Sequence, residues 1–399
     1  MTRADRPSIA LLCSGLDHIY RGHESFARDL LDMLSTDGRV TLFKGSGPDS
    51  LLEKRVDCIT RLAPELAQIQ PMCSPKWDNA FREHERYRIE SESFAYGALP
   101  LLLQTQPDII HCLEKEACQI IYANRHLFGK TPAIVFSNGG ALTAKQIPNC
   151  DLIQEHTPYN LSRSRRDKAL YIPHGIDLGL FDPMCTANHR ALFRQRLNIP
   201  QDALVVITVG RISRDHKRTH YPITEVAKIP GAHLVLAGQD GDDADEVRAL
   251  AQTVMPGRSH FMRLMRRELP AAYAAADLFT LGSRFETFGI VYLEAMAMGL
   301  PVICTNHRNQ REILKDAIFI DVLKPGALMA AIHGLSAAEH ARLAARGPQI
   351  VAEHYSISSL RDRYWAMYSR ALTNKLPVAR PSRADRIKAH IANALRGSR

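Results

Sequence analysis

The sequence lacks the features that would place the chain in a membrane or in an oxidising compartment. It has no run of about 18 uncharged apolar residues, the length that a membrane-spanning helix requires. The N-terminal residues lead directly into a short apolar run without a signal-peptide pattern, and the eight cysteines show neither Cys-x-x-Cys pairs nor zinc-ligand spacing. We therefore expect a cytoplasmic protein with reduced cysteines and no bound metal.

Acidic residues are scarce at the C-terminus, so the net charge of +9 is unevenly distributed. Residues 375–399 contain many Lys and Arg residues against Asp385 alone. Ile387, Ile391 and Leu395 follow helical spacing, which is compatible with a basic amphipathic helix on anionic lipid or with a solvated terminus. The tail therefore predicts at most a peripheral contact with an anionic membrane.

The dinucleotide-binding fingerprint G-x-G-x-x-G is also absent, which disfavours a nicotinamide-dependent dehydrogenase. Gly15 and Gly22 nevertheless lie in the loop after the first apolar run. A glycine at such a place lets the backbone approach a phosphate or a sugar closely. We retain both glycines as weak candidates for a ligand contact.

Strand-like and helical segments alternate along both halves of the chain, which predicts two doubly wound parallel α/β sheets. In the first half, strands are predicted at 9–13, 40–44, 109–112, 133–137, 152–155 and 170–172. In the second half, strands are predicted at 204–209, 232–237, 259–262, 278–281 and 302–305. The Pro- and Gly-rich segment YIPHGIDLGLFDP separates the halves, so we predict Rossmann-like domains at 1–182 and 183–354, a helix at 355–375 and a basic tail at 376–399. Ligands of such sheets bind at the carboxyl ends of the strands.

The most informative segment is LFTLGSRFETFGIVYLEAMAMGLPVICTN, residues 278–306, which reads as strand, loop, helix and strand. A helix beginning near Phe288 would point its free N–H groups at the loop that holds Glu286, and such a helix end binds anions. Glu294 would lie about 9 Å further along the helix axis. Two carboxylates flanking an anion site match the sugar, diphosphate and ribose of a nucleotide sugar. An exposed acidic helix face is the competing interpretation, and the surrounding motif disfavours it.

Two cations follow the predicted strand at 204–209. Arg211 and Lys217 lie in VGRISRDHK, where a strand's carboxyl end would present them to a diphosphate. Arg suits forked contacts with phosphate, and Lys acts as a point charge. The other charges in this segment are also compatible with a solvated loop. Combined with the helix near Phe288, the pattern favours phosphate binding.

These motifs together resemble the retaining glycosyltransferases of family 4, which have the GT-B fold. The resemblance covers about residues 8–373 and rests on RGHE (21–24), YIPHGIDLGLF (171–181), VGRISRDHK (209–217) and YAAADLFTLGSRFETFGIVYLEAMAMGLPVI (273–303). It implies an α/β fold of two facing Rossmann-like domains with a cleft between them. It also implies that the C-terminal helix crosses back to the N-terminal domain.

The resemblance further implies a UDP-, GDP- or ADP-linked sugar donor, bound without a metal, and a hydroxyl acceptor on a glycan, a lipid-linked molecule or a small molecule. Nucleic acid is not an expected partner. The implied catalytic residues are Arg211, Lys217 and Glu286. The implied donor-binding residues are Gly15, Gly22, Arg263 near the base, Thr287, Phe288, Gly289 and Ile290 at the sugar, and Glu294 at the ribose.

The sequence departs from the family at a histidine that commonly contacts the donor sugar. Leu113 and the segment 138–140 stand where relatives carry that histidine. Asn138, Gly139 or His156 could replace it, whereas His111 is expected to be a satisfied core histidine. The departure leaves two alternatives open: a catalytically inactive GT-B subunit that binds an active partner, or an epimerase or phosphorylase of the same fold.

Overall fold

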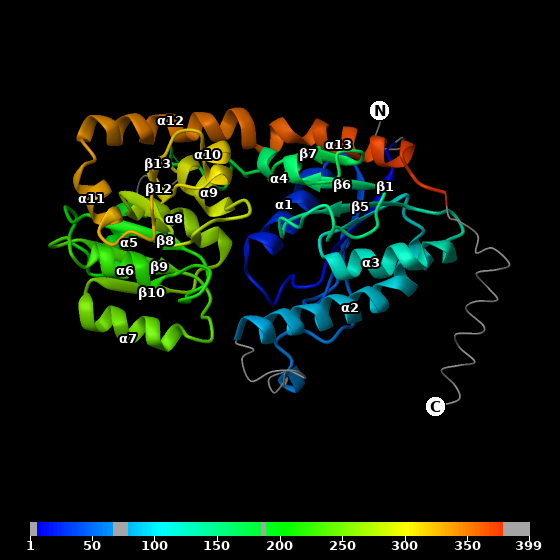
Figure 1. The fold of residues 1–399 in the computed structure, drawn as a ribbon, viewed down its shortest axis with the longest axis horizontal. Helices are drawn as coiled ribbons and strands as arrows, with labels where there is room; N and C mark the ends of the chain where they lie inside the picture. The colour runs from blue at the N-terminus through cyan, green and yellow to red at the C-terminus, as the bar shows by residue number, and fades with distance from the viewer. Residues whose placement is uncertain (1–5, 67–78, 185–188, 378–399) are drawn as a thin grey trace.

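The computed structural model describes residues 6–66, 79–184 and 189–377. Two α/β domains lie side by side, the N-terminal domain in blue and cyan and the C-terminal domain in green to orange (Figure 1). Each domain is built on one parallel sheet. In the described ranges, no helix has the length and apolar character needed to cross a bilayer.

The N-terminal sheet has seven strands in the order β3-β2-β1-β4-β5-β6-β7. Its strands are β1 (Ser8–Cys13), β2 (Arg39–Lys44), β3 (Glu53–Arg55), β4 (Ile109–Cys112), β5 (Ala133–Ser137), β6 (Leu152–Glu155) and β7 (Ala169–Tyr171). Its helices are α1 (Gly22–Ser35), α2 (Asn79–Thr105), α3 (Lys115–Asn124) and α4 (Pro158–Arg163), with short 3-10 turns at Pro64–Leu66 and Arg125–Leu127. The order reverses direction at β1 and β4, which places the switch point of the sheet beside the start of α1.

The C-terminal sheet has six strands in the order β10-β9-β8-β11-β12-β13. Its strands are β8 (Val205–Val209), β9 (His233–Ala237), β10 (Ser259–Met262), β11 (Leu278–Thr280), β12 (Val302–Thr305) and β13 (Ile318–Ile320). Its helices are α5 (His189–Arg196), α6 (His220–Val226), α7 (Ala244–Val254), α8 (Leu269–Ala275), α9 (Ile290–Ala297), α10 (Arg308–Leu314), α11 (Ala327–His333) and α12 (Ala337–Tyr355), with a 3-10 turn at Arg266–Glu268. The switch point lies between β8 and β11.

Both faces of each sheet are covered by buried hydrophobic side chains. Along β1, Ile9 and Leu11 belong to one cluster, and Ala10 and Leu12 belong to the cluster on the other face. This alternation follows from the two-residue period of a strand. A sheet buried on both faces reads as a nearly continuous apolar run, which explains the composition of these strands.

The final helix, α13 (Ile357–Thr373), returns to the N-terminal domain, as predicted. Helix α12 buries Ile350 and Val351 in the C-terminal core, whereas α13 packs side chains such as Leu360 in the N-terminal core. Ser356 separates the two helices and caps α13, because its hydroxyl accepts a hydrogen bond from the Ser359 N–H at 3.2 Å. Figure 1 shows α12 and α13 running along one edge of both domains. Residues 378–399 of the predicted basic tail lie outside the described residues.

His111 connects α13 to the N-terminal sheet. Its side chain is fully buried, and its ring nitrogens lie 2.9 Å from the Tyr368 hydroxyl and 2.7 Å from the Ser137 hydroxyl. Both nitrogens are therefore satisfied, which confirms the prediction of a core histidine. Burial lowers the pKa of His111 to about 3, so the imidazole is neutral in the folded protein.

We expect this buried histidine to make stability depend on pH. The unfolded chain takes up a proton below the ordinary pKa of 6.5, whereas the folded chain does so only near 3. The stabilising contribution is therefore complete above 6.5 and is lost as the pH falls. In His111→Gln, the slope of the unfolding free energy against pH should be shallower near pH 5 by about 1.4 kcal/mol per pH unit.

The measurement is urea unfolding at several pH values, followed by the fluorescence of Trp365 in a Trp77→Phe background. Trp365 is suitable because it lies on α13 and packs in the same cluster as Tyr368. Equal slopes for the two proteins would contradict this explanation.

Candidate active site

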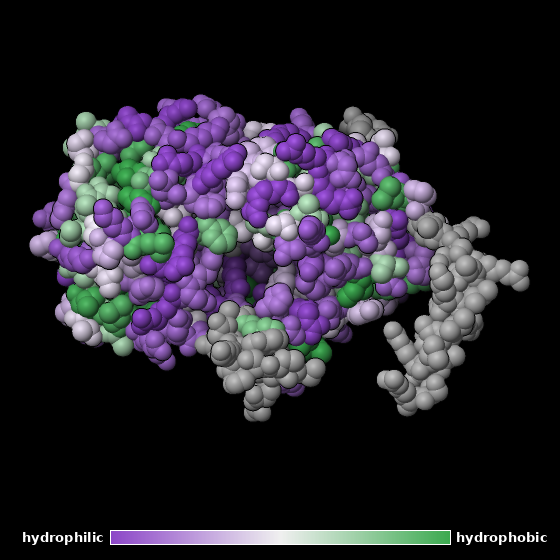
Figure 2. Space-filling view, in the orientation of Figure 1, coloured by the Kyte–Doolittle hydropathy of each residue, from purple (hydrophilic) through white to green (hydrophobic). Residues whose placement is uncertain are grey.

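A cavity of about 630 Å³ lies between the two domains. Figure 2 shows its opening as a hollow between the lobes, surrounded mainly by hydrophilic residues. The walls come from the loops that follow β1, β5 and β6 on one side and β8, β9, β10 and β11 on the other. The carboxyl ends of both sheets therefore face the same space, and its volume is within the usual range for ligand pockets, about 300–1,000 Å³.

Most of the predicted site residues come together in this cavity. Those that line it are Gly22, Gly139, His156, Arg211, Lys217, Arg263, Glu286, Thr287, Phe288, Gly289, Ile290 and Glu294. Segments separated by more than 200 positions in the chain thus meet in one place.

Gly15 and Asn138 are the two predicted site residues that do not line the cavity. A Cβ atom at Gly15 would lie 2.4 Å from Oε1 of Glu24, so this glycine is needed for close packing inside the N-terminal domain. The Asn138 amide donates hydrogen bonds to Oε1 of Glu155 and to the Leu142 carbonyl, both at 2.9 Å. Its side chain stabilises the loop after β5 and is not available to a ligand.

The loop before α9 presents free backbone N–H groups. The helix begins at Ile290, two residues later than predicted, because Gly289 adopts a left-handed conformation with φ of 79° as its N-cap. A Cβ atom at Gly289 would lie 2.6 Å from the Tyr292 ring, so only glycine fits. Among the described residues, the N–H groups of 287–290 have no hydrogen-bond acceptor. The loop and the helix end therefore form an anion-binding surface.

Glu286 is held rigidly at the edge of this surface. Its backbone carbonyl accepts hydrogen bonds from the side-chain amides of Asn309, at 2.6 Å, and Gln310, at 2.8 Å. Its carboxylate is 2.7 Å from the Lys217 ammonium group. Burial alone would raise the pKa of Glu286, but the charge and hydrogen bond of Lys217 together with smaller contributions from neighbouring groups outweigh it, and the pKa is lowered. Glu286 is therefore ionised at neutral pH.

Arg211 also lines the cavity. Its guanidinium forms an ion pair with Glu83 of α2, which belongs to the other domain, and lies 3.6 Å from Asp242. Glu83 also accepts a hydrogen bond from Arg21 at 2.7 Å. Sequence reasoning missed Glu83, because it lies in the charged stretch FREHERYR, where every position looks like solvated helix surface.

Glu294 is buried one turn inside α9. Its carboxylate accepts a hydrogen bond from the Tyr273 hydroxyl at 3.0 Å and lies 3.6 Å from Nε of Arg266. Arg266 also forms an ion pair with Asp29 of α1, which joins the two domains. Burial raises the pKa of Glu294, although Arg266 opposes the rise. Sequence analysis identified Glu294 but neither Arg266 nor Asp29.

Aromatic rings close the inner end of the cavity. Phe26 stacks on His174 with centroids 4.1 Å apart, and His156 meets His174 edge-on at 4.1 Å. Burial lowers the pKa of His156 to about 3 and that of His174 well below its ordinary value, so both rings are neutral. Neither ring nitrogen of His174 has a hydrogen-bond partner in the described residues. This wall of the cavity is therefore uncharged.

Three potential metal ligands meet behind this wall: Cys13, His23 and Glu114, with their ligand atoms all within 4.8 Å of one another. Glu114 already accepts a hydrogen bond from the Ser14 N–H at 2.8 Å and lies 3.3 Å from Nε2 of His23. Burial, together with the charge of Glu114, raises the pKa of the Cys13 thiol well above its usual range. Glu114 thus already makes hydrogen bonds to other residues at this end of the first sheet.

Comparison with known proteins relates the second domain to one family. Residues 189–344 match the model of the glycosyl transferases group 1. The lipopolysaccharide core biosynthesis glycosyltransferase LpsE of Rhizobium meliloti is 32% identical over 180 residues, which are 44% of this chain and 52% of LpsE. The match thus spans about half the length of that relative.

Solved structures resemble nearly the whole chain. Sucrose-phosphate synthase from Thermosynechococcus elongatus has a TM-score of 0.72 at 20% identity, over 92% of this chain and 100% of its own. HepE from Anabaena, in complex with UDP and glucose, has a TM-score of 0.69 at 16% identity, over 91% of this chain and 99% of the HepE chain. This chain has two facing Rossmann-like sheets and a helix that crosses back between the domains. Together with these similarities, that architecture shows the GT-B fold.

The Arg266–Asp29 contact leads to a prediction about the closure of the two domains. Burial raises the pKa of Asp29 to about 7, against the opposing charge of Arg266. The ion pair is therefore fully charged only above pH 7. A raised pKa means that the closed cleft disfavours the ionised carboxylate, so at pH 8 the wild type should be more open than Asp29→Asn and have the larger radius of gyration measured by small-angle X-ray scattering. At pH 6 the wild-type carboxyl is largely protonated, so the two proteins should agree; a larger difference at pH 6 than at pH 8 would contradict this explanation.

Proposed function

We propose that the protein is a retaining glycosyltransferase of family 4, which transfers a sugar from a nucleotide-sugar donor to an acceptor hydroxyl without a catalytic metal. One observation carries this proposal. Arg211, Lys217 and the free N–H groups of 287–290 converge on one cavity, with the carboxylates of Glu286 and Glu294 on either side. The family match to residues 189–344 supports it, because that segment contains all of these residues.

The positive groups of the cavity supply the chemistry that this transfer needs. As the bond between the sugar and the diphosphate breaks, negative charge develops on the departing phosphate oxygen. Arg211, Lys217 and the N–H groups before α9 are already in place to stabilise that charge, so little reorganisation is required. The new bond forms between the anomeric carbon and the acceptor oxygen, on the face that the phosphate leaves, and the acceptor proton passes to the phosphate. This route retains the anomeric configuration.

Glu286 serves as a hydrogen-bond acceptor for hydroxyls of the donor sugar in this proposal. It is ionised and fixed by Lys217, and attack on the anomeric carbon by a carboxylate, as in retaining glycosidases, is not required. Glu294 would accept from the ribose hydroxyls, and Arg263 would lie beside the base. UDP is the first nucleotide to test, because the similar HepE structure contains UDP and glucose.

The acceptor would bind against the N-terminal wall of the cavity. Gly139 opens space there, and the neutral rings of His156 and His174 can meet hydroxyl groups without introducing charge. A hydroxyl of a glycan, a lipid-linked molecule or a small molecule is the proposed acceptor class.

Two substitutions test the donor site. In Lys217→Gln the ammonium that faces the leaving phosphate is lost, and in Glu286→Gln the sugar-binding carboxylate becomes neutral. Each should lower kcat about 100-fold or more, the usual cost of losing one preorganised group at a developing charge. Lys228→Gln is the matched control, because Lys228 lies just after α6 and pairs with Glu225 outside the cavity. Release of UDP, GDP or ADP from a panel of donors is the measurement.

The same assay separates the proposal from its alternatives. Release of nucleoside diphosphate by the purified chain, unchanged by a chelator, supports the metal-independent transferase. Activity only with a partner protein would indicate a binding subunit. Conversion of the donor sugar without any acceptor, or dependence on inorganic phosphate, would indicate an epimerase or a phosphorylase. Normal kcat in both variants would refute the site assignment.

We also propose peripheral contact of the basic tail with anionic membrane. Deleting residues 376–399 removes most of the local positive charge, so binding to vesicles that contain anionic lipid should weaken. Co-sedimentation with anionic and with neutral vesicles measures this. Equal binding of the full chain and the truncated chain would rule out the tail as the contact.

A further inference from the structure

We propose that Arg21 is a third diphosphate-binding cation, contributed across the cleft by the N-terminal domain, and that the Glu83 carboxylate occupies its anion site when no donor is bound. This inference deepens the proposed function and rests on it. It concerns a residue to which the family resemblance assigns no role.

The first observation is that one carboxylate joins two arginines from different domains. Oε1 of Glu83 accepts a hydrogen bond from Nη2 of Arg21 at 2.7 Å, and Oε2 accepts from Nη1 of Arg211. Each oxygen thus binds one guanidinium group. A phosphate also has at least two oxygens free to accept from two guanidinium groups, and charged, planar donors are well suited to it. The guanidinium groups of Arg21 and Arg211, with the Glu83 carboxylate between them, therefore form an anion site that spans the cleft.

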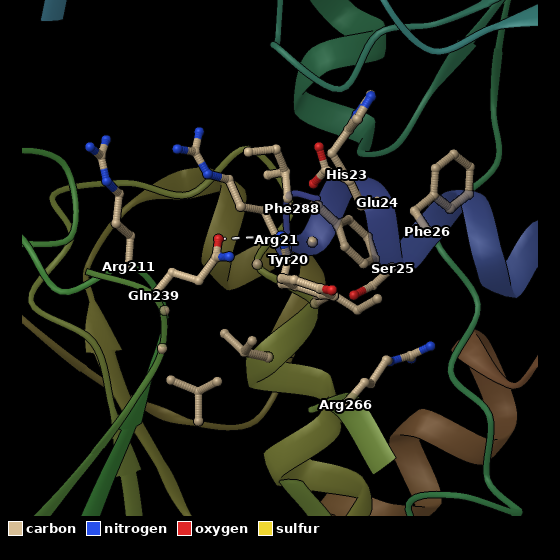
Figure 3. A pocket seen from close by; sticks show the side chains of 18 of the residues that line it. Tyr20, Arg21, His23, Glu24, Ser25, Phe26, Arg211, Gln239, Arg266 and Phe288 are labelled. Carbon is tan, nitrogen blue, oxygen red and sulfur yellow. Dashed lines mark hydrogen bonds between the residues drawn. The ribbon is translucent and has the colours of Figure 1, made fainter. Parts of the chain in front are cut away.

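The second observation is that Arg21 is placed for this role by its backbone. It is the N-cap residue of α1, with φ of −131° and ψ of 173°, immediately before Gly22. The N–H of the preceding residue, Tyr20, donates to Oε1 of Gln239 in the other domain at 3.3 Å. In Figure 3 the side chains of Arg21 and Arg211 come from different segments, and both guanidinium groups lie in the upper left part of the view. The hydrogen bond between Tyr20 and Gln239 thus holds this loop against the other domain, and the Arg21 side chain remains beside the pocket.

The third observation is that the resident anion can be exchanged. The side chains of Arg21 and Glu83 are 39% and 28% exposed, and Arg211 is 19% exposed. All three side chains are partly open to solvent, so a dissolved anion can reach them. The two arginines lower the pKa of Glu83 although burial opposes them, so a negative charge is already stabilised there. A diphosphate carries more negative charge than one carboxylate and can replace it between the same two guanidinium groups.

The experiment compares diphosphate with monophosphate binding. Isothermal titration calorimetry with UDP and UMP, GDP and GMP, and ADP and AMP gives the affinity ratio of each pair for the wild type and for Arg21→Gln. If Arg21 contacts the terminal phosphate, the variant should lose about tenfold of the diphosphate affinity while monophosphate affinity is unchanged, as expected for one charged hydrogen bond. Arg21→Lys should restore part of the ratio.

Two further variants make the result specific. Arg28→Gln is the matched control, because Arg28 also lines the cavity but is paired with Asp17 and Glu53. The ratio of diphosphate to monophosphate affinity in Arg28→Gln should equal that of the wild type. Glu83→Gln removes the competing charge and should increase diphosphate affinity severalfold, whereas a purely structural role of Glu83 would decrease it. Thermal unfolding of each variant checks that it is folded.

The outcomes separate this inference from the proposed function. If the wild type binds none of the three nucleoside diphosphates, the proposed function fails and this assignment fails with it. If the wild type binds one of them and the ratio is unchanged in Arg21→Gln, or diphosphate affinity falls in Glu83→Gln, only the assignment of Arg21 and Glu83 is overturned.

Discussion

Pairing of opposite charges across the cleft is the interaction on which the arrangement of this molecule depends. The cations Arg211, Lys217 and Arg266 each lie against a carboxylate inside a partly buried space. Like charges concentrated there without counter-ions would repel one another and lose hydration. Two of these pairs join residues of different domains, so the same contacts that neutralise the cavity also hold the domains together. Binding of a charged ligand and closure of the cleft are thereby linked.

The backbone supplies hydrogen-bond donors for an anion in addition to the charged side chains. Gly289 turns the chain immediately before α9, and the N–H groups of 287–290 are left free to bind an anion. The rigid support comes from Asn309 and Gln310, whose amides hold the backbone carbonyl of Glu286. A ligand would exchange Glu83 and part of the pairing with Glu286 for its own phosphates, with little change in the frame around them.

Sequence patterns predicted much of the fold because parallel strands buried on both faces are distinctive. Each predicted strand overlaps a strand of the structure, and the helix predicted at 355–375 overlaps α13, whose crossing back the family resemblance implied. The strand β3 was not predicted, because Glu53–Arg55 contains no apolar residue; β13 was not predicted either. At the site, the residues that belong to local motifs, such as Glu286 and Glu294, were identified. Glu83, Asp29 and Arg266 were not, because their partners are distant in the chain and no local pattern marks such pairs.

The most direct test of the central claim is a crystal structure of the protein with the nucleoside diphosphate that it binds most tightly. The account predicts phosphate oxygens in contact with Arg211, Lys217 and the N–H groups of 287–290, and the ribose beside Glu294. It would be contradicted by a nucleotide bound outside this cavity, or by one inside it with its phosphates away from these groups while Arg211 and Lys217 keep Glu83 and Glu286 as their only partners.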